Sequence, residues 1–438
     1  MKVCVQGLWH LGSVTAAALA SVGHEVAGLD YDAATIAALS RGAPPLFEPG
    51  LQELIGQGLE CGRLRFLDDP SAAVRDAEVL WIAYDTPVDE DDVADVDFVR
   101  AQIERTLPHL SPGTMVLISS QMPVGSVRRL ESRAAAGWPD RDLRFACSPE
   151  NLRLGKALEV FLKPDRIVVG VRRAADRDRL QRLLRPITDR IEWMSVESAE
   201  MTKHAINAFL AMSVTFANEI AAICEAAGAD AKEVERGLKS EARIGPKAYL
   251  APGGAFAGGT LARDVEFLES AAGASGLRIA LLRAIGASND EHKQWARRKL
   301  VEVFGDLNGV IVAVWGLTYK PGTSTLRRSL SVEVCADLLQ HGARLQVHDP
   351  AAEALPDAWS TRVRRTVGPF EALARAQALV VATEWPEYRQ VPIDSIAALP
   401  QPLVVLDANR FLAAWSALAR VRYIAVGSVQ PPAPGADS

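Results

Sequence analysis

Three residues near the start of the chain have the types and spacing needed to bind a dinucleotide. Gly7 and Gly12 stand where an apolar run that begins at Val3 turns into a helical pattern. Glycines there permit a tight turn and close packing of the helix on the strand. Asp30 closes the next short apolar run, where a carboxylate would accept hydrogen bonds from a ribose diol and repel a 2′-phosphate. The pattern favours NAD over NADP.

Trp9 departs from this fingerprint. It takes the middle position of the usual Gly-x-Gly-x-x-Gly, where glycine lets the backbone approach a pyrophosphate. On the two glycines and Asp30 alone, a βαβ unit without a ligand is the alternative.

The same arrangement recurs near the other end of the chain. Residues 310–349 turn at Gly316, continue with a helical period, and reach Asp349 at the same spacing after Gly342 as Asp30 has in the first copy. Strand, tight turn, helix and strand make half of a doubly wound sheet. Two such halves predict one site for a dinucleotide and another for a second nucleotide.

The bulk properties describe a soluble globular chain. With 438 residues, 49% hydrophobic and 23% charged, the prior is about three domains of ~150 residues each. A net charge of -6 argues against a nucleic-acid partner, which needs a basic face. The five cysteines lack CxxC or metal spacing, so we expect free thiols, no metal, and a cytoplasmic protein. We read no signal peptide and no apolar run near the ~20 residues that span a membrane.

The elements that must position these residues alternate between strands and helices. Such alternation predicts a parallel sheet with helical crossovers. Further strands of the first sheet are expected at 77–84, 114–120, 143–148 and 166–171.

Residues 196–229 differ from the rest, because they form one long helical pattern without proline. We interpret this helix as a connector and a dimer surface. The predicted fold is therefore α/β, with two Rossmann-like doubly wound domains joined by a long central helix. The expected divisions are an NAD-binding domain at 1–195, the central helix, dimerisation region and glycine-rich active-site loop at 196–304, a nucleotide-sugar domain at 305–428, and a disordered tail at 429–438.

A series of short motifs carries a family resemblance. Their order and spacing resemble the UDP-glucose/GDP-mannose dehydrogenase family over nearly the whole chain. The resemblance implies NAD, a homodimer, a nucleotide-sugar substrate, and oxidation of a sugar primary alcohol to a carboxylate by two hydride transfers, as in polysaccharide biosynthesis. The motifs are FEPGL (47–51), DTP (85–87), MPVG (122–125), SPENLRLG (148–155), KPDRIVVG (163–170), KHAINAFLA (203–211), FANE (216–219), RIGP (243–246), GLTYKPGTSTLR (316–327), HDP (348–350) and TEW (383–385).

The resemblance also assigns a reacting centre. Glu150, Lys203, Asn207 and Asp264 match family residues that surround the reacting alcohol. An amine, an amide and carboxylates could remove the hydroxyl proton and steady the developing oxyanion. Lys203 and Asn207 stand one helical turn apart and share a face. A solvated surface charge is the alternative for Lys203 taken alone.

Binding residues follow from the same matches. Lys320 and Arg327 match positions that contact phosphates, and Arg328 adds positive charge where the family has an acid. The expected cofactor contacts are Gly7, Leu11, Gly12, Asp30, Thr86 and Arg327, and the expected substrate contacts are Leu152, Arg243, Tyr249, Phe256, Gly258 and Lys320.

Several departures bear on the reaction. Thr260 stands at the position of the family's catalytic cysteine, and Leu154, Gln121, Asp85 and Arg263 replace a glutamate, a threonine, a glycine and a lysine. A threonine hydroxyl needs a dedicated base to attack an aldehyde, whereas a thiol of pKa ~8.5 needs little help. The residues that the resemblance assigns to the first hydride transfer are present. The cysteine that would form a covalent thioester is replaced by Thr260.

Three outcomes follow for an NAD-dependent nucleotide-sugar dehydrogenase of this kind. It stops at the aldehyde, it oxidises the aldehyde hydrate without covalent catalysis, or, given Trp9 and Asp85, it is a nucleotide-binding relative without dehydrogenase activity. Cys147 could be considered as a substitute nucleophile, but it ends an apolar run. A buried free thiol is the better interpretation of Cys147.

Overall fold

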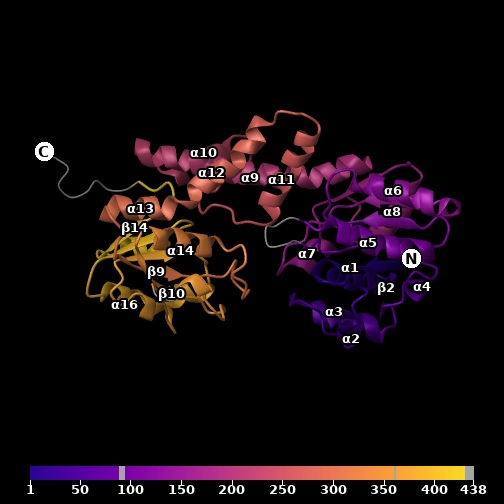
Figure 1. The fold of residues 1–438 in the computed structure, drawn as a ribbon, viewed down its shortest axis with the longest axis horizontal. Coiled ribbons are helices and arrows are strands. Elements are labelled where there is room, and N and C mark those ends of the chain that lie inside the picture. The colour runs from indigo at the N-terminus through magenta and orange to yellow at the C-terminus, as the bar shows by residue number, and fades with distance from the viewer. Residues whose placement is uncertain (88–93, 360–361, 430–438) are drawn as a thin grey trace. The chain divides into compact units, whose positions relative to one another are not determined.

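The computed structural model describes residues 1–87, 94–359 and 362–429. The chain divides into two compact units, 1–205 and 206–438, each built on its own sheet (Figure 1). Residues 430–438 of the predicted proline-rich tail lie outside the described residues. The predicted α/β fold with a sheet in each of two domains and a long helix between them is confirmed.

The first unit holds an eight-stranded sheet in the order β3-β2-β1-β4-β5-β6-β7-β8. The strands are β1 (Lys2–Gln6), β2 (Glu25–Leu29), β3 (Leu64–Leu67), β4 (Val79–Ile82), β5 (Met115–Ile118), β6 (Arg144–Cys147), β7 (Ile167–Val171) and β8 (Ile191–Met194). Its helices are α1 (His10–Ser21), α2 (Ala33–Leu39), α3 (Leu51–Glu60), α4 (Pro70–Ala73), α5 (Val96–Thr106), α6 (Ser126–Gly137), α7 (Ala157–Leu162) and α8 (Asp176–Leu184).

One expectation for this sheet is wrong. Alternating elements predicted parallel strands throughout, but β7 pairs antiparallel with β6. The intervening segment contains only the short helix α7 and does not return the chain to the end of the sheet where β6 begins. An antiparallel neighbour does not need such a return. The strands β3 (LRFL) and β8 (IEWM) were not predicted, because each short run is interrupted by a charged residue and lacks the continuous apolar character of β4 and β5.

The second unit repeats the first six strands in the order β11-β10-β9-β12-β13-β14, all parallel. These strands are β9 (Ile311–Trp315), β10 (Arg344–His348), β11 (Val363–Arg365), β12 (Ala378–Val381), β13 (Leu403–Asp407) and β14 (Val421–Ile424). The helices are α10 (Ala231–Ser240), α11 (Thr260–Ala274), α12 (Ala280–Lys293), α13 (Trp295–Phe304), α14 (Leu330–Gln340), α15 (Pro369–Ala372) and α16 (Ile393–Ala397).

The predicted internal repeat holds at the level of backbone geometry. Gly7 and Gly316 both have φ of 89°. The N–H of Gly7 donates to Leu29 at 2.9 Å, and that of Gly316 donates to His348 at 2.8 Å. A side chain at Gly7 would lie 2.7 Å from the Tyr84 ring, so the turn requires glycine for both its conformation and its space.

The long helix α9 spans Val196–Ala227, close to the predicted 196–229. By length and composition it is apolar enough to cross a membrane, contrary to our expectation that no segment approaches that limit. The core helix of a soluble protein passes the same test. Its buried positions include Ala208, Ala211 and Ala217, whose small side chains allow close packing against neighbouring elements.

Candidate active site

The β1–α1 turn has the shape of a dinucleotide cradle. A Cβ atom at Gly12 would lie 1.6 Å from the carbonyl oxygen of Gly7, so only glycine lets α1 begin this close to β1. The first turn of α1 contains no acidic residue. The partial positive charge of this helix end suits an anion such as a pyrophosphate.

Asp30 lies at the end of β2, beside this turn, and is half-buried. Its Oδ2 accepts from the N–H of Leu8 at 2.8 Å, and its Oδ1 accepts from the N–H of Asp32 at 3.1 Å. These two bonds fix the carboxylate at the carboxyl end of the sheet, where a ribose is bound in doubly wound folds. Gly7, Gly12 and Asp30 therefore lie together, as predicted for the adenosine half of NAD.

Asp349 holds the matching place in the second unit but is used differently. It is buried and accepts from the N–H groups of Leu317 and Thr318 at 2.7 and 2.9 Å, and from the Trp385 indole at 3.1 Å. Although burial opposes it, these donors lower the pKa of the Asp349 carboxyl. The TEW motif thus supplies a structural partner for Asp349, and the carboxylate braces the turn after β9.

Trp9 and Asp85 mark where the cradle departs from the usual pattern. Trp9 precedes α1 directly, and its indole is 53% exposed. The Asp85 Oδ2 accepts from the N–H of Leu11, in the first turn of α1, at 3.0 Å. Burial of the carboxyl raises the pKa of Asp85, with Glu150 acting in the same direction. Asp85 as a whole residue nevertheless remains exposed to solvent on one side. Asp85 and Leu11 thus pair with each other at the predicted cofactor site.

Thr86, another predicted cofactor contact, uses its hydroxyl to join two loops. Its Oγ1 donates to the carbonyl oxygen of Gln121 at 2.7 Å. The bond ties the segment after β4 to the segment after β5, both at the carboxyl end of the sheet.

Glu150 and Lys203 meet, as the resemblance implied. The Lys203 Nζ lies 3.4 Å from Glu150 Oε1, with side chains 11% and 22% exposed respectively. The other carboxylate oxygen of Glu150 accepts from the N–H of Leu152 at 2.7 Å. Lys203 is therefore not a solvated surface charge, and the pair is held at the end of β6 with some access to solvent. The Leu152 side chain, a predicted substrate contact, packs instead against the first unit's core.

Glu48 is a buried residue beside the candidate site to which motif matching gave no role. It is 3% exposed and accepts from the N–H groups of Gly155 and Ala157 at 2.8 and 2.7 Å. Its Oε2 also lies 3.1 Å from His10 Nε2. Glu48 thereby joins the start of α1 to the loop that carries Glu150. The signal in the sequence was a carboxylate inside the FEPGL motif, to which no role was given.

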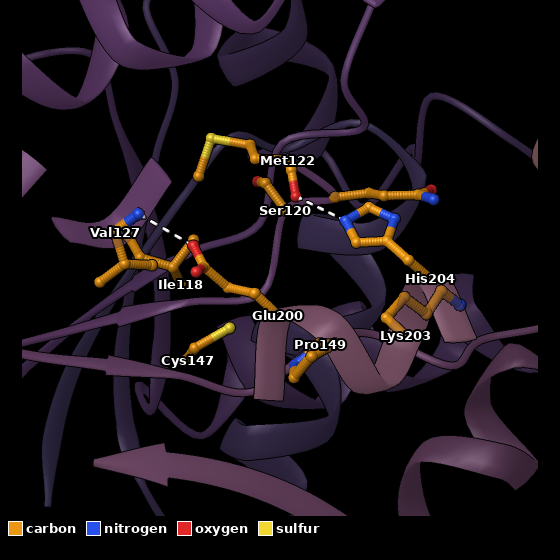
Figure 2. A pocket seen from close by; sticks show the side chains of 10 residues that line it. Ile118, Ser120, Met122, Val127, Cys147, Pro149, Glu200, Lys203 and His204 are labelled. Carbon is orange, nitrogen blue, oxygen red and sulfur yellow. Dashed lines mark hydrogen bonds between the residues drawn. The ribbon is translucent and has the colours of Figure 1, made fainter. Parts of the chain in front are cut away.

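A small cavity of about 20 Å³ adjoins Lys203 (Figure 2). His204 Nε2 donates to the carbonyl oxygen of Met122 at 3.0 Å, and Glu200 accepts from the N–H of Val127 at 2.9 Å. The volume suits one water molecule. The Ser120 hydroxyl lines the cavity and has no hydrogen-bond partner among residues 1–87, 94–359 and 362–429.

Cys147 lines the same cavity (Figure 2), so its reactivity needs to be judged. It is buried, and burial raises the pKa of its thiol well above the usual value, with Glu200 adding to the effect. A thiol that resists ionisation is a poor nucleophile. The structure therefore agrees with the interpretation of Cys147 as a buried free thiol.

Asn207 and Asp264 meet in the second unit. The Asn207 Nδ2 donates to Asp264 Oδ2, and the two residues are 6% and 0% exposed respectively. Asn207 lies on α9, four residues after Lys203, and Asp264 lies in the first two turns of α11. The amide is thus oriented by a buried carboxylate.

Thr260 begins α11 and is exposed. Gly259 before it has φ of 109°, and a Cβ there would lie 3.6 Å from a guanidinium nitrogen of Arg328 and 3.8 Å from the Tyr319 hydroxyl. Among the described residues of the second unit, no side chain hydrogen-bonds to the Thr260 hydroxyl. A base that could activate this hydroxyl is therefore not seen there.

A candidate substrate cavity in the second unit has a volume of about 640 Å³. Tyr249, Phe256 and Lys320, three predicted substrate contacts, line it. Phe256 and Gly258 also line a neighbouring cavity of about 220 Å³. Two other predicted binding residues line neither cavity: Arg243, whose side chain is 88% exposed and paired with Glu241, and Arg327.

The 640 Å³ cavity also contains polar residues that the sequence analysis missed. Asn409 Oδ1 accepts from the N–H of Gly254 at 2.8 Å, and Asn409 Nδ2 donates to Glu384 at 2.7 Å. His292 lies 2.8 Å from the carbonyl of Gly253, and burial lowers the pKa of its ring. Glu384 and Asn409 follow β12 and β13 closely, so their place after strand ends was an available signal.

Comparison with known proteins places these features in a family. Descriptions of the UDP-glucose/GDP-mannose dehydrogenase family match three segments: its NAD binding domain at residues 1–188, its central domain at 197–291, and its UDP binding domain at 313–414. The chain belongs to this family. The suspected resemblance is confirmed, and so is NAD as the cofactor.

Curated relatives agree over nearly the full length. The UDP-glucose 6-dehydrogenase of Pseudomonas aeruginosa is 35% identical, with 94% of each chain covered. The UDP-glucose 6-dehydrogenase of Rhizobium meliloti is 34% identical, covering 98% of this chain and 99% of the relative. Among solved structures, a UDP-glucose dehydrogenase from Pyrobaculum islandicum is 31% identical with a TM-score of 0.84, and 97% of each chain is covered.

These findings make the protein an NAD-dependent enzyme of the nucleotide-sugar dehydrogenase class. NAD, when bound, accepts a hydride from the carbon being oxidised. In this chain the glycines of the β1–α1 turn and Asp30 fit its adenosine half, while Trp9 and Asp85 do not fit the usual pyrophosphate contact.

Proposed function

We propose that this enzyme oxidises the C6 primary alcohol of UDP-glucose, or of a closely related nucleotide sugar, and releases or retains the aldehyde as its main product. In this step the alcohol carbon loses a hydride to NAD⁺ and the hydroxyl loses a proton, so that one aldehyde, one NADH and one proton result. The choice of a uridine nucleotide rests on the UDP-binding domain match and on the names of the relatives.

The first oxidation has its proposed machinery in place. Lys203 would hold the reacting oxygen through its ammonium group, while Glu150, 3.4 Å away, positions that group. Asn207, oriented by Asp264, would donate a second hydrogen bond to that oxygen or to a water. Donors aimed at a developing oxyanion stabilise it more than they stabilise the neutral alcohol.

Thr260 is the observation that carries the stop at the aldehyde. It takes the position that we assign to the family's cysteine, at the start of α11, and its hydroxyl has no hydrogen-bonded base among the described residues of the second unit. Leu154, where the family has a second glutamate, is 38% exposed and supplies no proton acceptor. Cys147 does not replace the missing thiol, because its pKa is raised by burial.

The test is the ratio of NADH formed to UDP-glucose consumed, measured together with mass spectrometry of the product under aldehyde-trapping conditions. We expect about one NADH per sugar, because without the covalent thioester the second oxidation is lost. Slow appearance of a second NADH, with no adduct on the protein, would indicate oxidation of the aldehyde hydrate.

Thr260→Cys and Thr260→Ala provide the matched comparison. We expect Thr260→Cys to restore at most a weak second step, since Leu154 and Arg263 have also changed. Thr260→Ala should leave the first NADH unaffected. Rapid formation of the carboxylate by the unaltered protein through an ester at Thr260 would contradict the proposal.

We also propose that α9 is the dimer surface, that the matched segments act as NAD-binding, central and nucleotide-sugar regions, and that the enzyme works in the cytoplasm in polysaccharide biosynthesis. The names of the relatives give the class of enzyme and do not name a pathway. For the dimer, the support is a stripe of exposed apolar side chains on α9, which is tested below.

A further inference from the structure

Asp85 accepts a hydrogen bond from a backbone N–H group at the place where a dinucleotide would bind. Its carboxylate oxygen lies 3.0 Å from the Leu11 nitrogen, in the first turn of α1. In doubly wound folds the pyrophosphate binds at the N-terminus of the helix that follows the first strand. The same turn has no acidic residue of its own, so Asp85, brought in from the end of β4, is the anion bound to this helix terminus.

The surrounding packing holds Asp85 in this place. Tyr84, directly before it, lies against Gly7, where an added Cβ would be 2.7 Å from the ring. Thr86, directly after it, is tied to Gln121 by a bond of 2.7 Å. The segment 84–86 is therefore held on both sides of Asp85, and the carboxylate, although the residue is partly exposed, is directed at α1 by its bond to the Leu11 N–H.

Charged groups face Asp85 from two other elements. Burial of the carboxyl is the largest effect on the pKa of Asp85 and raises it; the N–H of Leu11 and the charge of His10, both in α1, lower it, and Glu150, after β6, raises it. Behind these groups, Glu48 lies 3.1 Å from His10, and Lys203 lies 3.4 Å from Glu150. Burial and the nearby Glu150 carboxylate both favour the protonated form of Asp85. Protonating Asp85 is therefore easier than protonating an ordinary surface aspartate.

We propose that Asp85 is a built-in competitor of the cofactor, so that NAD binds only when the Asp85 carboxylate leaves the N-terminus of α1 or takes up a proton. Two anions cannot share the Leu11 N–H, and their charges repel at this distance. The residue therefore sets the affinity for NAD, and through its proton it makes that affinity depend on pH. The inference rests on the family's NAD site and not on the product of the reaction.

The experiment measures the dissociation constant of NAD by calorimetry for the unaltered protein, Asp85→Asn and Asp85→Gly. Asparagine keeps the shape and removes the charge, and glycine removes both charge and hydrogen-bond acceptor. We expect Asp85→Gly to bind NAD about tenfold more tightly, as for one partly screened charge pair, with Asp85→Asn between it and the unaltered protein. No turnover is needed for this measurement.

Lowering the pH adds a second measurement. Because the pKa of the Asp85 carboxyl is raised in the fold, NAD affinity of the unaltered protein should approach that of Asp85→Asn as the pH is lowered from neutrality, since proton uptake neutralises the competitor. The unaltered protein and Asp85→Asn share every other titratable group. The quantity to compare is therefore the ratio of the two dissociation constants at each pH, which should fall towards one as the pH falls.

Two controls make the outcome specific. Asp178→Asn removes an equal charge from the first turn of α8, a helix whose Leu183 contacts His24 beyond the far end of α1; it should leave NAD affinity unchanged. Adenosine, which lacks the pyrophosphate, should bind all four proteins equally. Equal or weaker NAD binding by both Asp85 variants, an equal gain for adenosine, or no NAD binding by any variant would overturn the inference.

Discussion

Lys203 shows how a partner decides the role of a single charged residue. On sequence alone a lysine on a helix is most often solvated, yet here its ammonium group pairs with Glu150 and adjoins a cavity that suits one water molecule. Glu150 is in turn held by the N–H of Leu152. The pair is therefore fixed from both sides, which is what an oxyanion contact requires.

Lys203→Ala should lower turnover of the nucleotide sugar by about 10²–10³, the size of the loss when one oxyanion donor is removed. The measurement is the steady-state rate of NADH formation, with circular dichroism to check the fold. Lys239→Ala is the matched control, because Lys239 is also paired, with Glu235 at 2.7 Å, but lies on α10. A Lys203→Ala variant of near-normal rate would remove this residue from the catalytic set.

At the scale of elements, an ion-pair network ties together three parts of the first unit. Arg172, directly after β7, pairs with Glu131 of α6 at 2.7 Å and with Glu197 in the first turn of α9 at 2.5 Å. Arg128 of α6 also pairs with Glu197 at 2.8 Å. The network fixes the start of α9, and with it the direction in which the helix carries Lys203.

This network predicts acid sensitivity. The Arg172 and Arg128 guanidinium groups lower the pKa of Glu197 from 4.5 to about 2. A carboxyl whose folded-state pKa is lowered stabilises the fold above its unfolded pKa, and this stabilisation is lost as the pH falls through the folded value. Between about pH 4.5 and pH 2 the network should thus lose about 1 kcal/mol, discounted for solvent screening.

The check is the urea midpoint of the unaltered protein and of Glu197→Gln, compared at each pH. The variant should be less stable at neutral pH, and the difference should shrink as the pH falls towards 2. Glu60→Gln, which alters an exposed glutamate at the end of α3, should show no such convergence. A constant difference between Glu197→Gln and the unaltered protein across the range would rule out this account.

At the scale of the whole molecule, α9 leaves a stripe of large apolar side chains in contact with solvent. Phe209, Phe216 and Ile223 are 60%, 45% and 62% exposed, and they recur every seven residues along the helix. Residues at this spacing share one face. An apolar stripe of this kind marks a surface that binds a partner, and a second copy of the chain is the partner we propose.

Phe216→Glu should therefore convert a dimer into a monomer, because it places a charge in the middle of an apolar interface. Light scattering after size-exclusion chromatography gives the mass directly. Phe370→Glu serves as the control, since Phe370 is 46% exposed on α15, outside the stripe. A dimeric Phe216→Glu protein, or a monomeric unaltered protein, would contradict the proposed interface.

The sequence by itself determined the α/β fold, the repeat, the long helix and the NAD fingerprint. Each depends on local rules: a glycine that must adopt positive φ, as Gly7 and Gly316 do, or a helical period that continues for eight turns. Motif order added the family, and with it the candidate residues Glu150, Lys203, Asn207 and Asp264.

Only the tertiary structure decided what each polar group binds. Asp30 and Asp349 are equivalent in sequence, yet Asp349 is saturated by backbone and indole donors. The reversal of β7 and the contacts of Glu48 and Asp85 also join residues far apart in the chain. Hydrogen-bond partners and charge environments depend on which strand ends lie next to each other at one edge of a sheet. A local sequence pattern does not determine which strands are neighbours.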